Sequence, residues 1–502
     1  RARSPLVGSG RWELIRARSV SSAQTHARAQ RARAETAPQA APRGRRQLEA
    51  VVVGAGPNGL AAAVTLAQAE RCVLVLEAQN TIGGSTRTFE LTLPGFRHDI
   101  CSAIHPLGAA SPFFNSLGLD IEWVEPPAAL AHPFDDGTAL VVERSPAALG
   151  REYAKLVAPA IEIAPLLLEH LSCLARKPAS AGRFAAVALR GATTVARRLP
   201  TEHAQALFLG AAAHSVLPLD RKGTAGFGLG LLGLAHTHGW PFPRGGSQAI
   251  ADALAAKLRE LGGEIETGHG VRSLQDLPRA GIVVGDVTPR QLLTLGGDLL
   301  PPRYRRRLEH WRYGPGVFKI DYALDAPIPW RAQEVARAGT VHLGGSPAEI
   351  VESERAAWEG RHAERPFVLL AQQSLFDDAR APAGKHTAWA YCHVPHGSTV
   401  DVRPAVERQI ERFAPGFRDR ILAYAMHDTA EMERGNANLV GGDISAGANI
   451  LSRLARPLPY STPVRSLYVC SAATAPGPGV HGMCGHRAAR AALRRTDPSS
   501  EG

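Results

Sequence analysis

The feature that most constrains the fold is a glycine-rich turn between an apolar strand and an apolar helix. Ala50–Val53 is a short β-branched run, which predicts a buried parallel strand. It leads directly into Gly54-Ala55-Gly56-Pro57-Asn58-Gly59, and Leu60–Gln68 then has the alanine-rich character of a helix. A second apolar run, Cys72–Leu76, ends at the acidic Glu77. This order predicts a parallel α/β layer of the Rossmann type.

The residue types in this unit suit a bound dinucleotide. Gly54 permits a tight turn, Gly56 lets the backbone approach a pyrophosphate, and Gly59 lets the helix pack closely on the strand. The start of the helix offers free amides and the positive end of its dipole. Glu77 can accept a hydrogen bond from a ribose 2′-OH, which favours FAD or NAD over NADP. The predicted binding residues of this unit are Gly54, Ala55, Gly56, Pro57, Asn58, Gly59, Glu77 and Ala78.

The GxGxxG pattern alone is a weak signal in this chain. Gly228–Gly233 and Gly477–Gly482 match it too. Neither of them has the full context of a strand before, a helix after and an acidic residue at the right distance. We therefore interpret Gly228–Gly233 as a glycine-rich core segment.

Later segments extend the pattern. A double glycine follows the acidic residue, in Gly83-Gly84-Ser85-Thr86, and exposed amides there can reach phosphate or ribityl oxygens. Phe242–Ile250 precedes an amphipathic helix that ends at Gly262-Gly263. Near the C-terminus, Leu467–Cys470 predicts a strand, Ser471–Gly482 a loop and Gly485–Leu493 a helix.

Residues 48 to 495 together resemble the phytoene dehydrogenase-like FAD oxidoreductases, and among them the pyridine nucleotide-disulfide oxidoreductase domain-containing protein 2 group. The resemblance implies FAD as cofactor. It also implies an α/β fold, with a discontinuous Rossmann-like FAD-binding domain and a mixed α+β substrate domain. By resemblance, Gly83, Gly84, Ser85 and Thr86 lie along the cofactor, Val271 approaches the adenine, and Gly479, Val480 and Gly482 lie at the flavin ring. One departure is Ser471-Ala472, where many relatives have Gly-Asp.

The domain boundaries follow from these matches. We expect the FAD-binding domain to comprise residues 47–105, 235–290 and 430–502, and the substrate domain residues 106–234 and 291–429. Residues 1–46 contain eleven arginines and two acidic residues, so most of the net charge of +11 lies there. We expect this segment to be a disordered basic tail, either a mitochondrial transit peptide or a spurious extension. A basic tail on a near-neutral body argues against nucleic-acid binding.

Two stretches without charged side chains, His203–Leu219 and Gly223–Pro243, predict a buried helix pair; the alternative is an apolar surface that reaches a membrane. The Arg303–Arg307 cluster predicts a solvated helix face, or else a patch for anionic lipid. The six cysteines form no CxxC pair, so a dithiol redox centre is not expected.

Candidate catalytic groups are few. His481 lies in the loop expected at the flavin, where it is either an acid or base or a histidine bonded to backbone. His98, Asp99 and His105 are candidates for the substrate cavity or for structural roles. No metal site is expected, because His236-Thr-His238 and His393-Val-Pro-His396 lack a known ligand pattern.

The function expected is dehydrogenation of a hydrophobic substrate, carotenoid-, retinoid- or lipid-like, by hydride transfer to flavin N5. Electrons would then pass to oxygen or a quinone. One alternative is a flavin amine oxidase, although no equivalent of its flavin-proximal lysine and paired aromatics stands out. Another is a non-catalytic FAD-holding interaction protein. We expect a cytoplasmic location, with a peripheral membrane contact as an option, or the mitochondrial matrix if the tail is a transit peptide.

Overall fold

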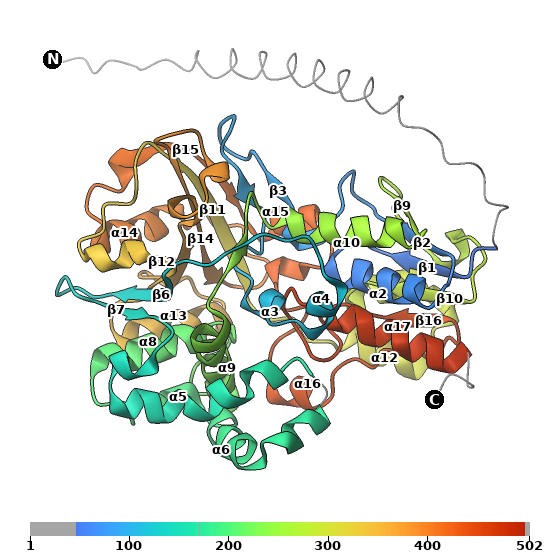
Figure 1. Ribbon diagram of the computed structural model, residues 1–502, viewed down its shortest axis with the longest axis horizontal. Helices are drawn as coiled ribbons and strands as arrows, with labels where there is room; N and C mark the ends of the chain where they lie inside the picture. Colours follow the sequence, from blue (N-terminus) through green and yellow to red (C-terminus); the bar gives the residue numbers. More distant parts are fainter. Residues whose placement is uncertain (1–46, 170, 497–502) are drawn as a thin grey trace. The chain divides into compact units, whose positions relative to one another are not determined.

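A parallel sheet forms around the predicted glycine-rich turn (Figure 1). The computed structural model describes residues 47–169 and 171–496. The sheet has the order β16-β10-β1-β2-β9, and every neighbouring pair is parallel. Its strands are β1 (Ala50–Val53), β2 (Val73–Leu76), β9 (Glu264–Glu266), β10 (Ile282–Gly285) and β16 (Leu467–Val469). They come from three separate parts of the chain.

Helices cover both faces of this sheet, as a parallel sheet requires. Ala50 and Val52 pack in one cluster with apolar residues of α2 (Pro57–Gln68), α10 (Gln248–Glu260) and α17 (Met483–Thr496). Val51 and Val53 point to the opposite face, where they pack with α11 (Pro289–Gly296) and α12 (Pro302–Glu309). The outer side of α12 exposes Arg303, Arg306 and Arg307, as both the predicted solvated face and its alternative, a patch for anionic lipid, require.

A second sheet has the order β15-β11-β14-β13-β12-β6-β7. All its pairs are antiparallel except β12 with β6. Its strands are β6 (Ala128–Pro133), β7 (Ala139–Val142), β11 (Gly316–Leu324), β12 (Ala338–Leu343), β13 (Val368–Ala371), β14 (His386–Val394) and β15 (Ile421–His427). Two small two-stranded ribbons, β3 (Thr88–Phe89) with β4 (His98–Asp99) and β5 (Trp123–Val124) with β8 (Phe242–Pro243), complete the strands of the described residues.

Helices also pack on the second sheet. One face, with Ile320 and Ala390, packs against Val406 and Ile410 of α14 (Arg403–Phe413). The other face shares an apolar cluster with Leu207 of α8 (Glu202–Ala213) and its neighbours. These neighbours are α5 (Arg151–Ile163), α7 (Ala192–Ala196), α9 (Thr224–His238) and α13 (Pro347–Trp358), with α6 (Pro178–Ala188) beside α5 and α9.

The structure confirms the predicted buried helix pair, which is α8 and α9. Two glycines of the second GxGxxG match explain the close packing of α9. A Cβ on Gly228 would lie 3.2 Å from the Ala212 backbone nitrogen of α8, and one on Gly233 would lie 2.8 Å from the Ala160 oxygen of α5. This segment is therefore part of the core, as expected. No helix of the described residues is long and apolar enough to cross a membrane.

The fold class is confirmed, with a Rossmann-like layer and a mixed sheet domain, but two predicted domain boundaries differ from the packing. Phe113 and Phe114 of α4 (Pro112–Leu117), expected in the substrate domain, pack with the parallel sheet. Leu292 and Leu308 do the same on its other face. The apolar pattern of a helix shows that one side is buried, but it does not specify the partner sheet. The expected basic tail, residues 1–46, lies outside the described residues.

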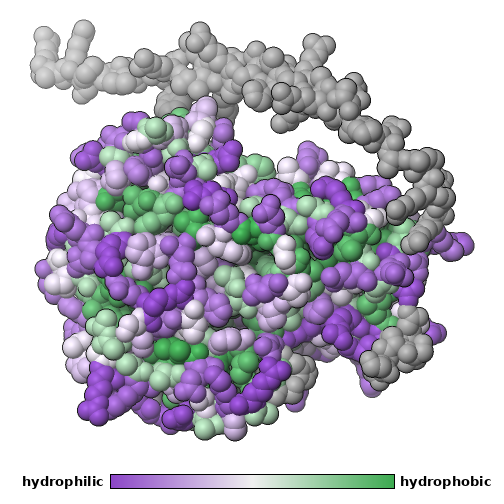
Figure 2. All heavy atoms as spheres, in the orientation of Figure 1, coloured by the Kyte–Doolittle hydropathy of each residue, from purple (hydrophilic) through white to green (hydrophobic). Residues whose placement is uncertain are grey.

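The remaining α-helices of the described residues are α3 (Pro106–Ala109), α15 (Thr429–Gly435) and α16 (Leu451–Ala455), and short 3₁₀ helices connect several elements. The described residues from Leu48 onward belong to one compact unit, which contains both sheets. On the face seen in Figure 2, hydrophilic residues make up much of the surface, and hydrophobic residues appear between them.

Candidate active site

A large cavity of about 1250 Å³ extends from the glycine-rich turn to the second sheet. Pockets for one drug-sized ligand usually measure about 300–1,000 Å³, so this cavity has room for a dinucleotide and a second molecule. Its dinucleotide part is lined by twelve of the predicted residues: Gly54, Gly56, Pro57, Asn58, Glu77, Ala78, Gly84, Ser85, Thr86, Val271, Gly479 and Val480. Ala55, Gly59, Gly83 and Gly482 do not line it.

The glycine-rich turn leaves no space for side chains. A Cβ on Gly56 would lie 2.7 Å from Asp286 Oδ2, and one on Gly59 would lie 2.0 Å from the Gly54 oxygen. Gly54 itself has a φ of +101°, which side chains rarely adopt. The first turn of α2, whose N-cap is Gly56, has no side-chain cap and no acidic residue. The Gly59 amide of this turn is bonded to Asp286, so the helix start offers a phosphate the Asn58 amide and the positive end of the helix dipole.

Glu77 is held at the end of β2 by backbone amides. Its Oε2 accepts a hydrogen bond from the Ala55 amide at 2.7 Å, and its Oε1 accepts one from the Gln79 amide at 2.9 Å. Each carboxylate oxygen has a second lone pair. The Glu77 side chain lines the cavity and can still accept a hydrogen bond from a ribose hydroxyl.

Asp286 is a site residue that the sequence reasoning missed. It follows β10 directly, and its Oδ2 accepts a hydrogen bond from the Gly59 amide at 3.0 Å. Burial raises its pKa to about 7, the Gly59 hydrogen bond lowers it, and the nearby Glu77 raises it further. The signal available was its position, because ligands of parallel sheets bind at the carboxyl ends of the strands.

The double-glycine loop is positioned by two neighbours. Gly83 and Gly84 have φ angles of +114° and +53°. The Gly83 amide donates to the Ala55 oxygen at 2.8 Å, which ties this loop to the glycine-rich turn. Ser85 Oγ accepts a hydrogen bond from Asn436 Nδ2 at 2.9 Å. Asn436 was also missed, since it is far away in the sequence.

The C-terminal loop reaches the cavity, but its histidine is fully engaged. His481 Nδ1 accepts a hydrogen bond from the Met483 amide at 3.0 Å, and its Nε2 donates to the Gly477 oxygen at 3.2 Å. Burial lowers its pKa to about 4, so the ring is neutral near pH 7. These contacts correspond to the backbone-bonded alternative. The predicted acid–base role stays a prediction, and the two hydrogen bonds do not favour it.

The Ser471-Ala472 departure also lies in the cavity wall. Ser471 is buried, and its Oγ accepts a hydrogen bond from the Ala473 amide at 3.4 Å. The Ala472 oxygen accepts one from Arg453 at 3.2 Å. The predicted departure therefore consists of two short side chains at the cavity wall.

A buried charged network lies beside the cavity. Lys319 lines the cavity and pairs with Asp321, which lies two residues further along β11. Burial raises the pKa of Asp321 to about 6 against the opposing effect of Lys319. His98 Nδ1 lies 3.6 Å from Asp321 Oδ1. The Trp389 and Tyr391 rings of the adjacent strand are 5.0 Å apart at 78° and also line the cavity.

The three candidates after the double glycine have different places. His105 lines the cavity, and its Nε2 bonds to Ser247 Oγ at 2.8 Å. His98 and Asp99 do not line it. Asp99 accepts a hydrogen bond from Arg380 at 2.8 Å; burial alone would raise its pKa, but this arginine and further hydrogen bonds lower it overall. The structure thus gives Asp99 a buried ion pair.

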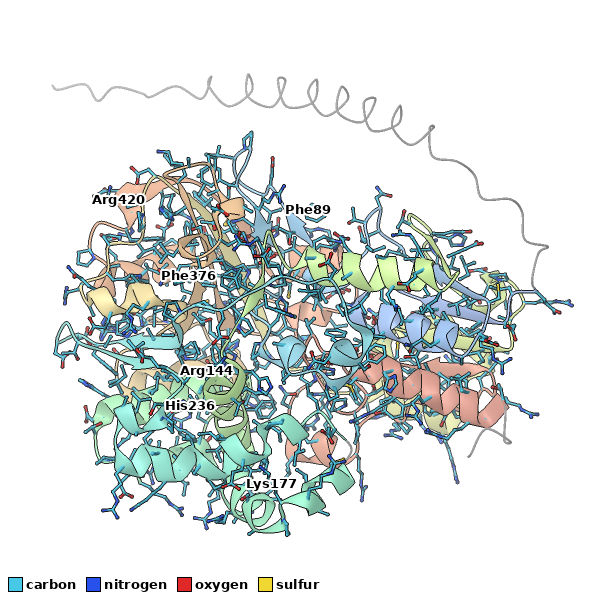
Figure 3. All side chains as sticks on the ribbon, viewed as in Figure 1. Phe89, Arg144, Lys177, His236, Phe376 and Arg420 are labelled. Atoms are coloured by element: carbon cyan, nitrogen blue, oxygen red, sulfur yellow. The ribbon has the colours of Figure 1, made fainter. Side chains whose placement is uncertain are left out.

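The histidine pairs bind protein groups. His236 bonds to the Tyr153 hydroxyl at 2.9 Å and to the Glu143 oxygen at 2.7 Å, and Figure 3 shows it close to Arg144. His393 Nδ1 lies 2.8 Å from Glu354 Oε2. Among residues 47–169 and 171–496, no group of three or more potential ligands could hold a metal ion.

Comparisons with known proteins agree with this site. Residues 52–117 match the family described as NAD(P)-binding Rossmann-like domain. The chain is 25% identical to mouse pyridine nucleotide-disulfide oxidoreductase domain-containing protein 2, over 89% of this chain and 94% of the relative. It is 26% identical to phytoene dehydrogenase from Streptomyces griseus, over 74% of this chain and 77% of the relative.

Solved structures share the fold. An oxidoreductase from Methanosarcina mazei aligns with a TM-score of 0.60 at 17% identity, over 88% of this chain and 100% of that one. Cyclohexylamine oxidase from Brevibacterium oxydans aligns with a TM-score of 0.56 at 16% identity, over 90% and 100%. The chain is therefore similar to flavin-type oxidoreductases and has their fold. More particularly, the predicted resemblance to the phytoene dehydrogenase-like proteins and to the mouse protein's group is confirmed.

Proposed function

We propose that this chain is an FAD-dependent oxidoreductase that dehydrogenates a hydrophobic substrate. The observation that carries the proposal is one continuous cavity, with the glycine-rich turn in one part and apolar residues such as Phe227 and Leu231 of α9 in another. FAD, when bound, supplies an N5 that accepts a hydride, and the electrons then pass to oxygen or a quinone.

The residues present fit FAD. The glycine-rich turn forms a cradle that a Cβ at Gly56 or Gly59 would fill. Asn58 Oδ1 is buried in the cavity wall without a partner in the protein, which leaves it available to a bound cofactor. Glu77 would hold the ribose, and the double-glycine loop with Ser85 and Thr86 would lie along the phosphates and ribityl chain.

The chain's own residues have two tasks in such a reaction. Phe227, Leu231 and Leu234 surround an apolar substrate and exclude water from it. Lys319, held by Asp321, presents an ion-paired ammonium group at the cavity wall. Orientation and water exclusion by the protein complement the redox chemistry of the cofactor.

The proposal is tested first by the absorption spectrum of the purified full chain and by identification of the cofactor released on denaturation. We expect a flavin spectrum and one FAD per chain. Anaerobic bleaching by apolar alcohols, alkenes and terpenoids then tests the reaction. A folded protein that stays colourless after incubation with FAD would contradict the proposal. A flavin that no reductive substrate bleaches would favour the FAD-holding interaction protein instead.

A second candidate function is amine oxidation. The sequence reasoning found no equivalent of the lysine and paired aromatics of amine oxidases, but the second sheet brings Lys319, Trp389 and Tyr391 together at the cavity. Anaerobic bleaching by a panel of primary and secondary amines tests this function against the first.

The cavity rim supports a peripheral membrane contact as part of the proposal. Leu189, Leu451 and Leu454 line the cavity and are 55%, 39% and 39% exposed. Exposed basic residues flank Leu189: Arg190 follows it directly, Arg183 lies on α6, and Lys177, labelled in Figure 3, directly precedes that helix. Such a rim suits an anionic lipid surface that delivers an apolar substrate.

This contact is tested by co-sedimentation with vesicles of phosphatidylcholine containing phosphatidylglycerol. We expect the Leu189→Ser/Leu451→Ser/Leu454→Ser variant to bind at least fivefold less than the unchanged protein. Leu299→Ser is the matched control, because Leu299 is 52% exposed and does not line the cavity. Equal binding of all three proteins would rule out the rim as the contact.

A further inference from the structure

The second sheet differs in polarity between its two faces. Along β14, Ala388, Ala390 and Cys392 join the apolar cluster that includes α14. Residues 389, 391 and 393 point to the opposite face, because side chains alternate along a strand. They are Trp389, Tyr391 and His393, and on this face β11 adds Lys319 and Asp321 and β12 adds Thr340 and His342. Burial of so many polar groups is costly unless each has a partner.

Two of these groups line the cavity and have no partner. Thr340 Oγ1 and Trp389 Nε1 are buried without a hydrogen bond, in residues that are only 4% and 9% exposed. An indole N–H can only donate, so its missing partner must be an acceptor. A threonine hydroxyl can donate to the same kind of atom. An apolar substrate alone would leave both groups unsatisfied.

Strand register places the two groups on either side of one small residue. Thr340 pairs with Ala371 on β13, and Ala371 pairs with Trp389 on β14. Because neighbouring strands lie about 4.8 Å apart, the Cα atoms of Thr340 and Trp389 are separated by roughly 10 Å across the alanine. The residue between them, Ala371, has only a methyl side chain, so neither donor finds a polar partner there.

The ionisable groups near these two donors are either ion-paired or uncharged. The carboxylates among the described cavity-lining residues are Glu77 and Asp286, both at the glycine-rich turn. Lys319 is neutralised by its pair with Asp321. His214, which lines the cavity and lies 3.1 Å from His342, is uncharged near pH 7 because burial lowers its pKa to about 3. A charged ligand group would therefore lack a counter-charge here.

We infer that Trp389 and Thr340 form a binding site for a neutral hydroxyl or carbonyl oxygen, so that the substrate is an apolar molecule bearing one such oxygen rather than a hydrocarbon. This inference rests on the proposed function, which makes the cavity a substrate site. The oxygen accepts hydrogen bonds from Trp389 Nε1 and Thr340 Oγ1, while Phe227 and Leu231 contact the apolar remainder. The two polar groups thereby orient an otherwise featureless substrate.

The test uses four ten-carbon probes with one skeleton: limonene, perillyl alcohol, perillaldehyde and perillylamine. Their dissociation constants are measured by titration calorimetry on the FAD-loaded full chain. We expect the alcohol or the aldehyde to bind about tenfold tighter than limonene. Trp389→Phe and Thr340→Val keep shape but remove one donor each, so each should reduce that preference about three- to tenfold. The double variant should bind all neutral probes within about twofold.

Tyr304→Phe is the matched control, because the Tyr304 hydroxyl is also buried without a partner but does not line the cavity. It should leave the preference for the oxygenated probes unchanged.

The inference is overturned if the oxygenated probes bind no tighter than limonene or not at all, if perillylamine binds tightest, or if both cavity variants keep the preference. Thr340→Val serves alone if Trp389→Phe does not fold. The flavin spectrum of each sample is recorded first, so loss of FAD is distinguished from loss of probe preference.

Discussion

The carboxylate of Asp286 accepts a hydrogen bond from the amide of Gly59 at 3.0 Å, although the two residues are 227 positions apart. This bond joins the carboxyl end of β10 to the first turn of α2. It also places the carboxylate 2.7 Å from where a Cβ on Gly56 would lie. The glycine-rich turn thus has glycines on one side and a buried acidic residue on the other.

Gly59→Ala should weaken FAD binding about tenfold or more, because the new Cβ would lie 2.0 Å from the Gly54 oxygen and must displace the turn. The measurement is a titration of the apoprotein with FAD, followed by flavin fluorescence. Gly182→Ala is the control, since a Cβ there meets no atom within 4 Å. Equal affinities for the two variants would contradict the prediction.

Asp286→Asn should make the protein more stable at pH 8 than the unchanged chain, by roughly 1–3 kcal/mol, and change its stability less at pH 5. Burial raises the folded pKa of Asp286 to about 7, above its ordinary 3.8. Between these two pKa values the folded state holds a proton that the unfolded chain releases. The contribution of Asp286 to the free energy of unfolding therefore falls as pH rises through that window. An asparagine oxygen can keep the Gly59 bond.

This comparison is made by urea unfolding of the apoprotein at both pH values. The exposed Asp378→Asn serves as control, since that side chain is 96% exposed. A stability difference between Asp286→Asn and the unchanged chain that does not vary with pH would refute the assignment.

Lys319→Met should lower the free energy of unfolding by about 3–5 kcal/mol, because it leaves the buried Asp321 carboxylate without its cation. The double variant Lys319→Met/Asp321→Asn should recover most of this loss. Both values come from urea unfolding. If the double variant is as unstable as the two single variants combined, the pair is not coupled and the prediction is wrong.

His481→Asn should destabilise the protein by about 1 kcal/mol and leave the pH profile of flavin reduction unchanged. Asparagine can still accept from the Met483 amide but loses the bond to Gly477. With a pKa of about 4, the histidine stays neutral above pH 5.5. The disappearance of one limb of the pH profile in this variant would instead establish the acid–base role.

Local patterns were sufficient for the dinucleotide unit. Strand, turn, helix and acidic residue follow each other within Ala50–Glu77. The glycines of the turn indicate a backbone conformation that other residues rarely adopt. The helix pair at α8 and α9 was equally clear, because long stretches without charge must be buried. The sheet on which α11 and α12 pack could not be predicted, because amphipathicity does not identify the surface that a helix covers.

The groups that face the substrate part of the cavity were decided by tertiary structure. Lys319, Thr340 and Trp389 lie on three different strands and meet only through strand order and register. Likewise, Asp286 reaches Gly59 only because β10 pairs with β1.

The amino-acid sequence by itself determined a Rossmann-type layer, most of the residues that line the cavity near its glycine-rich turn, and a largely apolar helical partner. The tertiary structure alone decided which polar side chains enter the cavity and which are consumed by backbone or ion pairs. The physical reason is range: turn geometry and helix start depend on residues a few positions apart, whereas hydrogen-bond partners, burial and pKa depend on segments hundreds of positions apart.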